Sequence, residues 1–195
     1  MSEVFSDEDT TKLFQLVHMF QRSALLHMGY IPDQNGNKYY DLAEAKEAID
    51  LLKNSPDSRR IVVTAWNPSV LDEIALPSCH SFFIFNVING KLNCHLTQRS
   101  GDIGLGVPFN LACYAALTQM IAQEVDLDLG EFSHYINDAH IYVNHIDGLK
   151  EQLEREPMDL PNLTIAKKPF WDLEFDDFKL ENYNHHPSIK FEVAV

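Results

Sequence analysis

The stretch Phe82-Phe-Ile-Phe-Asn-Val-Ile-Asn-Gly-Lys-Leu-Asn-Cys-His-Leu-Thr97 decides the fold of this chain. Residues 82–88 are apolar at nearly every position, which is typical of a strand buried on both faces within a sheet. Asn89-Gly90 is the dipeptide that most strongly favours a two-residue hairpin turn. Apolar and polar residues then alternate from Leu92 to Thr97, as in a strand with one buried face. The stretch therefore predicts two antiparallel strands near the centre of a sheet.

Helical and strand patterns follow on both sides of this hairpin. Residues 108–124 begin with Pro, which suits a first helical turn, and are apolar almost all round, so we expect a buried helix there. The remaining expected elements are helices over 13–25, 42–52 and 146–156, strands over 61–66 and 132–145, a loop or hairpin over 29–37, and short strands within 172–180 and 189–195. Together they predict one α+β domain.

Composition narrows the class of protein. The chain has 195 residues, 45% of them hydrophobic, which suits one domain with a single core. Its formal charge of -14 argues against general nucleic-acid binding, which requires a basic surface. No apolar run is long enough to cross a membrane, and the acidic residues 1–9 do not resemble a secretory signal. Three cysteines do not make a disulfide scaffold, so we expect a cytoplasmic protein with reduced thiols.

Cys79 is the candidate nucleophile. It follows Leu76-Pro-Ser and directly precedes the buried strand, a position from which a side chain can face a cleft. A nucleophilic thiol also needs a nearby cation to favour the thiolate. Of only five arginines, Arg59, Arg60 and Arg99 lie in two short segments that border strands and that could bind a phosphate group. A buried structural cysteine and surface ion pairs remain the alternative interpretations.

Polar side chains in two other segments could recognise the rest of a nucleotide. Asn110 offers both a donor and an acceptor, which matches the edge of uracil, although it could simply cap the helix. The alternating segment Asp138–Asn144 predicts a strand on which His140 and Tyr142 share a face, either to hold a sugar hydroxyl or only as a solvated surface. No Cys/His spacing matches a zinc site, so we expect no metal.

Several of these segments resemble the thymidylate synthase family. The similar stretches are Asp57-Ser-Arg-Arg-Ile-Val-Val-Thr-Ala-Trp-Asn-Pro68, Ala75-Leu-Pro-Ser-Cys-His80, Gln98-Arg-Ser-Gly-Asp102, Gly106-Val-Pro-Phe-Asn110 and Asp138-Ala-His-Ile-Tyr-Val-Asn-His145. The resemblance runs over about residues 41–195 and implies a catalytic domain there, with a mixed β-sheet and a buried central helix. Residues 1–40 would form a divergent helical segment and loop.

The resemblance implies reductive methylation of dUMP to dTMP, with 5,10-methylenetetrahydrofolate as co-substrate and no metal. Cys79, Arg99 and Asp102 would be catalytic, with the Cys79 thiolate adding to C6 of the base. The residues implied in binding dUMP are Arg59, Arg60, Arg99, Ser100, Gly101, Asp102, Asn110, His140, Ile141 and Tyr142. Arg59 and Arg60 would reach the phosphate in a partner subunit, which implies a homodimer.

Folate binding would use Asp102, Gly106 and the C-terminal Ala194, with Ala194 and Val195 closing over the co-substrate. The chain departs from the family's pattern at several positions. Gly104 stands where the family has a phenylalanine, Gly148 where it has a glutamine, and Glu192 where it has a proline. No segment of residues 1–40 matches the region that carries the family's catalytic glutamate. Two alternatives therefore stay open: a dUMP hydroxymethylase of the same fold, and a catalytically weak homologue that binds nucleotide or only dimerises.

Overall fold

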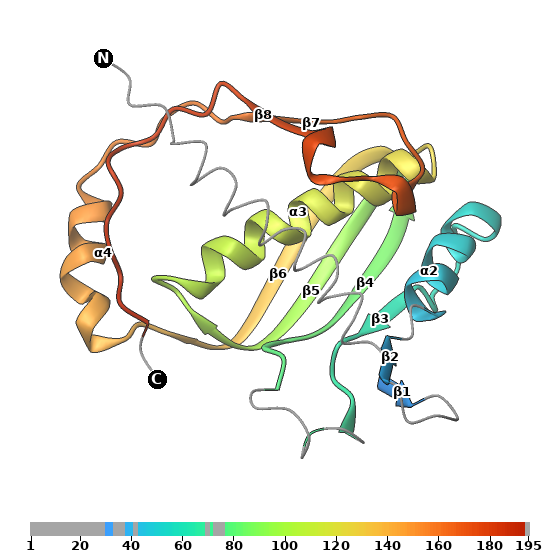
Figure 1. Cartoon of the computed structure of the whole chain (residues 1–195), viewed down its shortest axis with the longest axis horizontal. Coiled ribbons are helices and arrows are strands. Elements are labelled where there is room, and N and C mark those ends of the chain that lie inside the picture. Colours follow the sequence, from blue (N-terminus) through green and yellow to red (C-terminus); the bar gives the residue numbers. More distant parts are fainter. Residues whose placement is uncertain (1–29, 33–37, 41–42, 69–70, 72–76, 194–195) are drawn as a thin grey trace.

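A four-stranded sheet forms the centre of the computed structural model, which describes residues 30–32, 38–40, 43–68, 71 and 77–193 (Figure 1). Its strands are β3 (Val62–Thr64), β4 (His80–Ile88), β5 (Lys91–Asp102) and β6 (Asp128–His140), in the order β3-β4-β5-β6. The β3–β4 and β4–β5 pairs are antiparallel, whereas β5 and β6 are parallel. The sheet is therefore mixed, which confirms the expected fold class.

The hairpin between β4 and β5 turns at the predicted dipeptide. Asn89 and Gly90 have φ of 52° and 76°, and positive φ at both central residues is typical of a type I′ turn. This turn sets Ile88 opposite Lys91 and Phe85 opposite Cys94. The buried residues of both strands therefore face the same side of the sheet.

Helix α3 (Gly106–Glu124) covers that side of the sheet (Figure 1). It connects β5 to the parallel strand β6, a pairing that needs a long crossover rather than a tight turn. Tyr114 and Met120 are almost fully buried, but Leu111 is 42% exposed, so the helix is buried on one side only. Pro108 is the third residue of α3, where a missing N–H is tolerated as well as at the first. The core is completed by buried residues of α2 (Ala43–Asn54), namely Ala45, Ala48, Ile49 and Leu52.

The remaining elements lie around this centre. They are β1 (Tyr30–Pro32) and β2 (Lys38–Tyr40), paired as a hairpin, η2 (Val143–His145), α4 (Ile146–Leu153), β7 (Asn162–Ile165), η3 (Phe170–Asp172), η4 (Phe175–Asp177) and β8 (Phe178–Glu181). The segment after β8 returns alongside α4 (Figure 1). In the part of the chain that the structure describes, no helix is both long and apolar enough to span a membrane.

Some boundaries differ from those expected from the sequence. The predicted strand 132–145 ends at His140, and the chain turns into η2, so Tyr142 and Asn144 do not continue the strand face. Within 172–180, strand β8 covers 178–180, whereas residues 175–177 form a 3₁₀ turn, and residues 189–193 have no regular structure. Strand β7 was not expected. The expected helix over 13–25 lies outside the described residues.

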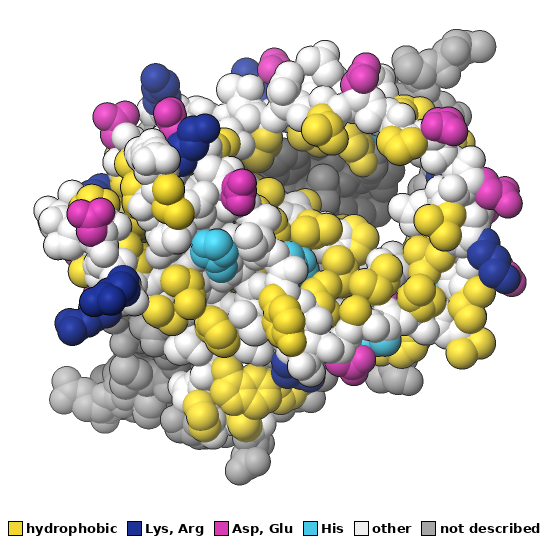
Figure 2. Space-filling view, turned by 180° about the vertical axis from the view of Figure 1, so that it is seen from behind, with side chains coloured by type: hydrophobic (Ala, Val, Ile, Leu, Met, Phe, Trp, Pro, Cys, Tyr) yellow, Lys and Arg dark blue, Asp and Glu magenta, His cyan; other side chains and the backbone are white. Residues whose placement is uncertain are grey.

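The face of the sheet opposite α3 has no covering layer among the described elements. Val62, Phe82 and Tyr135, from β3, β4 and β6, are exposed by 42%, 36% and 61% on this face. Figure 2 views the molecule from behind, and hydrophobic side chains spread across its centre with charges mostly at the margins. Exposed apolar surface of this extent is typical of an interaction site.

Candidate active site

Cys79 directly precedes the first residue of β4 and is half-buried. The neighbouring strand holds it in place, because the backbone N–H of Arg99 donates to the carbonyl oxygen of Cys79 over 2.8 Å. The side chain of Arg99 then reaches back along the loop, where Nε donates to Ser78 O at 3.1 Å and Nη2 to Pro77 O at 2.6 Å. The structure thus brings Arg99 against the two residues directly before the candidate nucleophile.

The Arg99 guanidinium is fixed from a second direction. Its central carbon lies 5.7 Å from the centroid of the Trp66 ring, a cation–π distance. Within the described residues, hydrogen bonds to protein use two of its five N–H groups. Among the described residues, the other three N–H groups have no hydrogen-bond partner in the protein.

The other two cysteines do not suit nucleophilic chemistry. Burial raises the pKa of the Cys94 and Cys113 thiols to about 12, so both stay protonated near neutral pH. Both contribute to the apolar core between the sheet and α3. Cys79 is the one cysteine of the three that is not buried.

A buried amide pair lies where β5 meets the first turn of α3. Gln98 Nε2 donates to Ser100 O at 2.8 Å and to Asn110 Oδ1 at 3.0 Å, and Gln98 Oε1 lies 2.7 Å from His134 Nε2. A carbonyl oxygen can only accept, so the bond to Ser100 fixes which end of the Gln98 amide is nitrogen. Asn110 must then turn its oxygen toward Gln98, and His134 must carry a proton on Nε2.

This network orients Asn110 for a ligand. Among the described contacts, its Nδ2 donors and the second lone pair of Oδ1 remain unused. The sequence analysis identified Asn110 but missed Gln98 and His134. A signal was present, because Gln98 follows Cys94 and Leu96 on the buried face of β5, and a polar side chain there needs buried partners.

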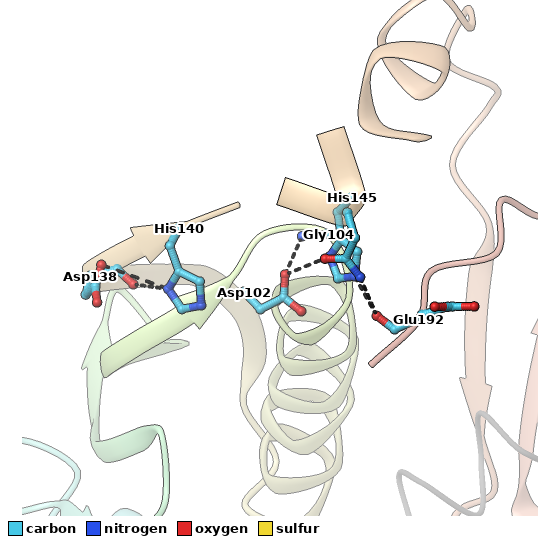
Figure 3. Close-up of polar contacts among 7 residues, drawn as sticks. Asp102, Gly104, Asp138, His140, His145 and Glu192 are labelled. Atoms are coloured by element: carbon cyan, nitrogen blue, oxygen red, sulfur yellow. Dashed lines mark hydrogen bonds and ion pairs between the residues drawn. The ribbon is translucent and has the colours of Figure 1, made fainter. Parts of the chain in front are cut away.

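Asp102 and His145 form a second polar cluster at the far end of β5 (Figure 3). Asp102 Oδ1 accepts the backbone N–H of Gly104 at 3.0 Å and lies 3.5 Å from His145 Nδ1. His145 is fully buried, and its Nε2 donates to the carbonyl oxygen of Glu192 at 2.7 Å. The cluster therefore links the end of the sheet to the C-terminal segment.

His140 lies next to this cluster because β6 pairs it with Asp102 in register. Its Nδ1 donates to Asp138 O at 3.2 Å, which leaves Nε2 as an acceptor (Figure 3). The Tyr142 ring meets the His140 ring edge-on at 5.1 Å and the His145 ring at 5.6 Å between centroids. Although Tyr142 is outside the strand, the structure still brings it to His140.

The order of these groups along the chain is that of a known family. The sequence matches the family model described as Thymidylate synthase over residues 15–195. The chain belongs to the thymidylate synthase family. A thymidylate synthase from Francisella philomiragia subsp. philomiragia is 48% identical over 178 residues, which cover 84% of this chain. The chain spans 64% of the length of that relative.

The other residues that the resemblance to thymidylate synthases implies lie in three places: on β5 and α3, on the exposed surface, and outside the described residues. Ser100 and Gly101 lie on β5 between Arg99 and Asp102, and Gly106 begins α3. Gly101 is packed so closely that an added Cβ would lie 2.9 Å from both Ile136 and Val107. Arg59 and Arg60, between α2 and the edge strand β3, are exposed, as is Ile141. Ala194 and Val195 lie outside the described residues.

No group of three or more His, Cys, Asp or Glu side chains gathers as a metal site in the part of the chain described. The candidate site is instead a row of groups along the end of β5 and its neighbours. In order along that strand it offers the amide of Gln98, the guanidinium of Arg99 bound to the loop that ends at Cys79, and the carboxylate of Asp102 near the His145 imidazole.

Proposed function

We propose that this chain catalyses the reductive methylation of dUMP to dTMP with 5,10-methylenetetrahydrofolate. The observation that carries the proposal is the double hydrogen bond of the Arg99 side chain to the two residues before Cys79. It keeps a permanent positive charge next to the loop that presents the one thiol of the chain that is not buried. The thiolate is the form of a cysteine that reacts as a nucleophile, and a guanidinium bound to the same loop could bind the phosphate of a nucleotide.

The reaction needs a thiolate because C5 of uracil is a weak nucleophile. Addition of Cys79 Sγ to C6 forms a carbon–sulfur bond and places the electron pair of the C5–C6 double bond in an enolate, which makes C5 nucleophilic. C5 then bonds to the one-carbon unit of the folate. Loss of the C5 proton then expels tetrahydrofolate and leaves an exocyclic methylene at C5. Tetrahydrofolate gives a hydride to this methylene and becomes dihydrofolate, while the carbon–sulfur bond breaks and releases the Cys79 thiolate. Covalent catalysis of this kind divides one high barrier into lower ones.

The polar groups beside Cys79 suit the parts of dUMP. The N–H groups of Arg99 that no described residue uses would bind the phosphate, with Ser100 and Gly101 beside it. Asn110, held by Gln98, would read the uracil edge. His140 and Tyr142 would hold the sugar hydroxyl near Ile141.

Asp102 is the candidate for the folate side of the site. Its side chain is 19% exposed, and Oδ1 is bound by Gly104, so Oδ2 remains to accept N–H groups of a pterin. Gly106 and the C-terminal Ala194 would complete this subsite. We propose a cytoplasmic location, because the chemistry requires a reduced thiol.

We further propose that the active form is a homodimer. Arg59 and Arg60 face solvent at the β3 edge of the sheet, and the apolar face opposite α3 is uncovered among the described elements. Pairing of two such faces would bury the apolar surface and bring the arginines to the partner's phosphate. An interface of this kind is self-complementary, as twofold symmetry requires.

Mass measurement after incubation with 5-fluoro-dUMP and methylenetetrahydrofolate tests the reaction. Fluorine at C5 cannot leave as a proton does, so the covalent complex should accumulate with the mass of protein, nucleotide and folate. The Cys79→Ser variant should not show this mass gain. The Cys113→Ala variant, which removes a buried thiol instead, is the control and should still show it. A wild-type protein that forms no adduct, or an adduct that survives in Cys79→Ser, would refute the proposal. Product analysis with dUMP then separates methyl from hydroxymethyl.

A further inference from the structure

The space above Gly148 on α4 is filled by the C-terminal tail, here residues 186–193. A Cβ added at Gly148 would lie 2.6 Å from Phe191 Cε1 and 2.9 Å from Ile189 Cγ2. Distances that short do not occur between real side chains, so any residue with a side chain at position 148 must displace the side chains of Phe191 and Ile189. The missing side chain at Gly148 therefore leaves a hole on the surface of α4, and the Phe191 ring fills it.

Other contacts also hold the tail, at Phe191, Glu192 and Pro187. The Phe191 ring packs on the His145 ring at 4.9 Å between centroids. His145 Nε2 donates to Glu192 O at 2.7 Å, and Asn144 Nδ2 donates to the same oxygen at 3.4 Å. Further back, Arg155 Nη1 donates to Pro187 O at 2.7 Å. Two consecutive residues, Phe191 and Glu192, thus anchor the end of the described chain.

His145 connects this anchor to the candidate folate site. Its ring fits because position 104 has no side chain: a Cβ on Gly104 would lie 2.8 Å from His145 Nδ1. The same nitrogen lies 3.5 Å from the Asp102 carboxylate (Figure 3). Asp102, Gly104, Phe191 and Glu192 therefore meet around one buried histidine.

We propose that Phe191 is a positioning residue, which locks into the hole at Gly148 and holds the C-terminal tail beside Asp102 before folate binds. The inference rests on the proposed function for its kinetic consequence. Ordering a free tail costs conformational entropy that the ligand must supply, whereas a tail already anchored costs little. Loss of the anchor should therefore weaken the binding of methylenetetrahydrofolate more than it slows the chemical step.

Cleavage by trypsin after Lys190 tests the anchor without any substrate. Trypsin needs a locally released chain, so an anchored tail should protect the Lys190–Phe191 bond. The loss of residues 191–195, followed by mass, should be about 10-fold faster in Gly148→Gln and in Phe191→Ala than in the wild type. Lys150→Gln, which places a glutamine on an exposed position of the same helix, is the matched control and should behave as the wild type does. Equal rates in wild type and both single variants would overturn the proposal.

The double variant Gly148→Gln/Phe191→Ala shows whether the two residues act together. If Phe191 fills the hole, the second change should add little to the first, because the ring that the glutamine would displace is gone. Effects that multiply would mean independent roles and would overturn the lock. Melting curves of all variants establish that each is folded, and the smaller Gly148→Ala change provides a second test at that position.

Steady-state kinetics test the consequence for the reaction. Both single variants should raise KM for methylenetetrahydrofolate about 10-fold, with kcat and the affinity for dUMP changed less than about 2-fold. Faster cleavage with an unchanged KM would overturn the positioning role. A wild-type protein that forms no adduct with 5-fluoro-dUMP would refute the proposed function alone, because the proteolysis cycle would still report on the anchor.

Discussion

Gln98 illustrates how one buried side chain can set the specificity of a site. Its amide joins Ser100, Asn110 and His134, so its loss would leave the buried Asn110 oxygen without a partner and remove the partner of the half-buried His134 N–H. We expect Gln98→Leu to lower the free energy of unfolding by about 2–3 kcal/mol and to raise KM for dUMP. Urea unfolding measures the first effect, with exposed Gln152→Leu as control. A stability equal to the wild type's would contradict the network.

Asn110 is the residue whose chemistry should decide the base. Its amide can donate to O4 of uracil and accept from N3–H, whereas cytosine offers a donor at position 4 and an acceptor at N3. Aspartic acid in its protonated form, or a carboxylate facing the amino group, suits cytosine better. Asn110→Asp should therefore shift the ratio of kcat/KM for dUMP over dCMP toward dCMP by at least about 10-fold. An unchanged ratio would exclude Asn110 from reading the base.

His134 should make stability depend on pH. Burial lowers its pKa below the ordinary 6.5, so the folded protein takes up this proton less readily than the unfolded chain. The stabilisation is complete above about pH 6.5 and is lost as the pH falls through the lower folded pKa. Relative to His134→Gln, the wild type should lose unfolding free energy between pH 7.5 and 5.5. A difference that does not change with pH would show that His134 titrates normally.

At the scale of elements, patterns of adjacent residues predicted most of the secondary structure. They did not predict which distant segments contact each other. The β4–β5 hairpin follows from Asn89-Gly90 and from the alternation beside it, which are properties of adjacent residues. The end of β6 at His140 could not be read in the same way. The apolar–polar alternation continues to Asn144, and it is the packing of His145 against Gly104 that turns the chain there. Gln98–His134 and Phe191–Gly148 join different elements, which no local pattern reports.

Helix α3 was correctly predicted to be buried from its largely apolar sequence. The sequence did not show that only one side of the helix is buried. Met120 is 1% exposed against the sheet, whereas Leu111 is 42% exposed. Met120→Ala should therefore destabilise the protein by about 2–5 kcal/mol, the usual cost of a core cavity, and Leu111→Ala by less than about 1 kcal/mol. Chemical denaturation of both variants measures the contrast. Equal losses would mean that another surface buries Leu111.

For the whole molecule, the apolar face of the sheet and the exposed Arg59 and Arg60 both favour the proposed homodimer. A subunit that exposes Val62, Phe82 and Tyr135 together would gain stability if this face paired with a second copy. The sequence could indicate this only through the family resemblance, because apolar residues on a second face look the same as core residues until the layers are known. Among the described elements, α3 covers one face of the sheet and none covers the other.

Hybrid dimers provide the test of a shared site. A Cys79→Ser chain keeps its arginines, and an Arg59→Ala/Arg60→Ala chain keeps its thiol, so each homodimer should be nearly inactive. When the two are unfolded and refolded together, half of the dimers are mixed. Each mixed dimer then holds one site with the thiol of one chain and the arginines of the other, so about a quarter of wild-type activity should return. If both arginines served the thiol of their own chain, mixing would restore nothing, since neither chain carries a complete set.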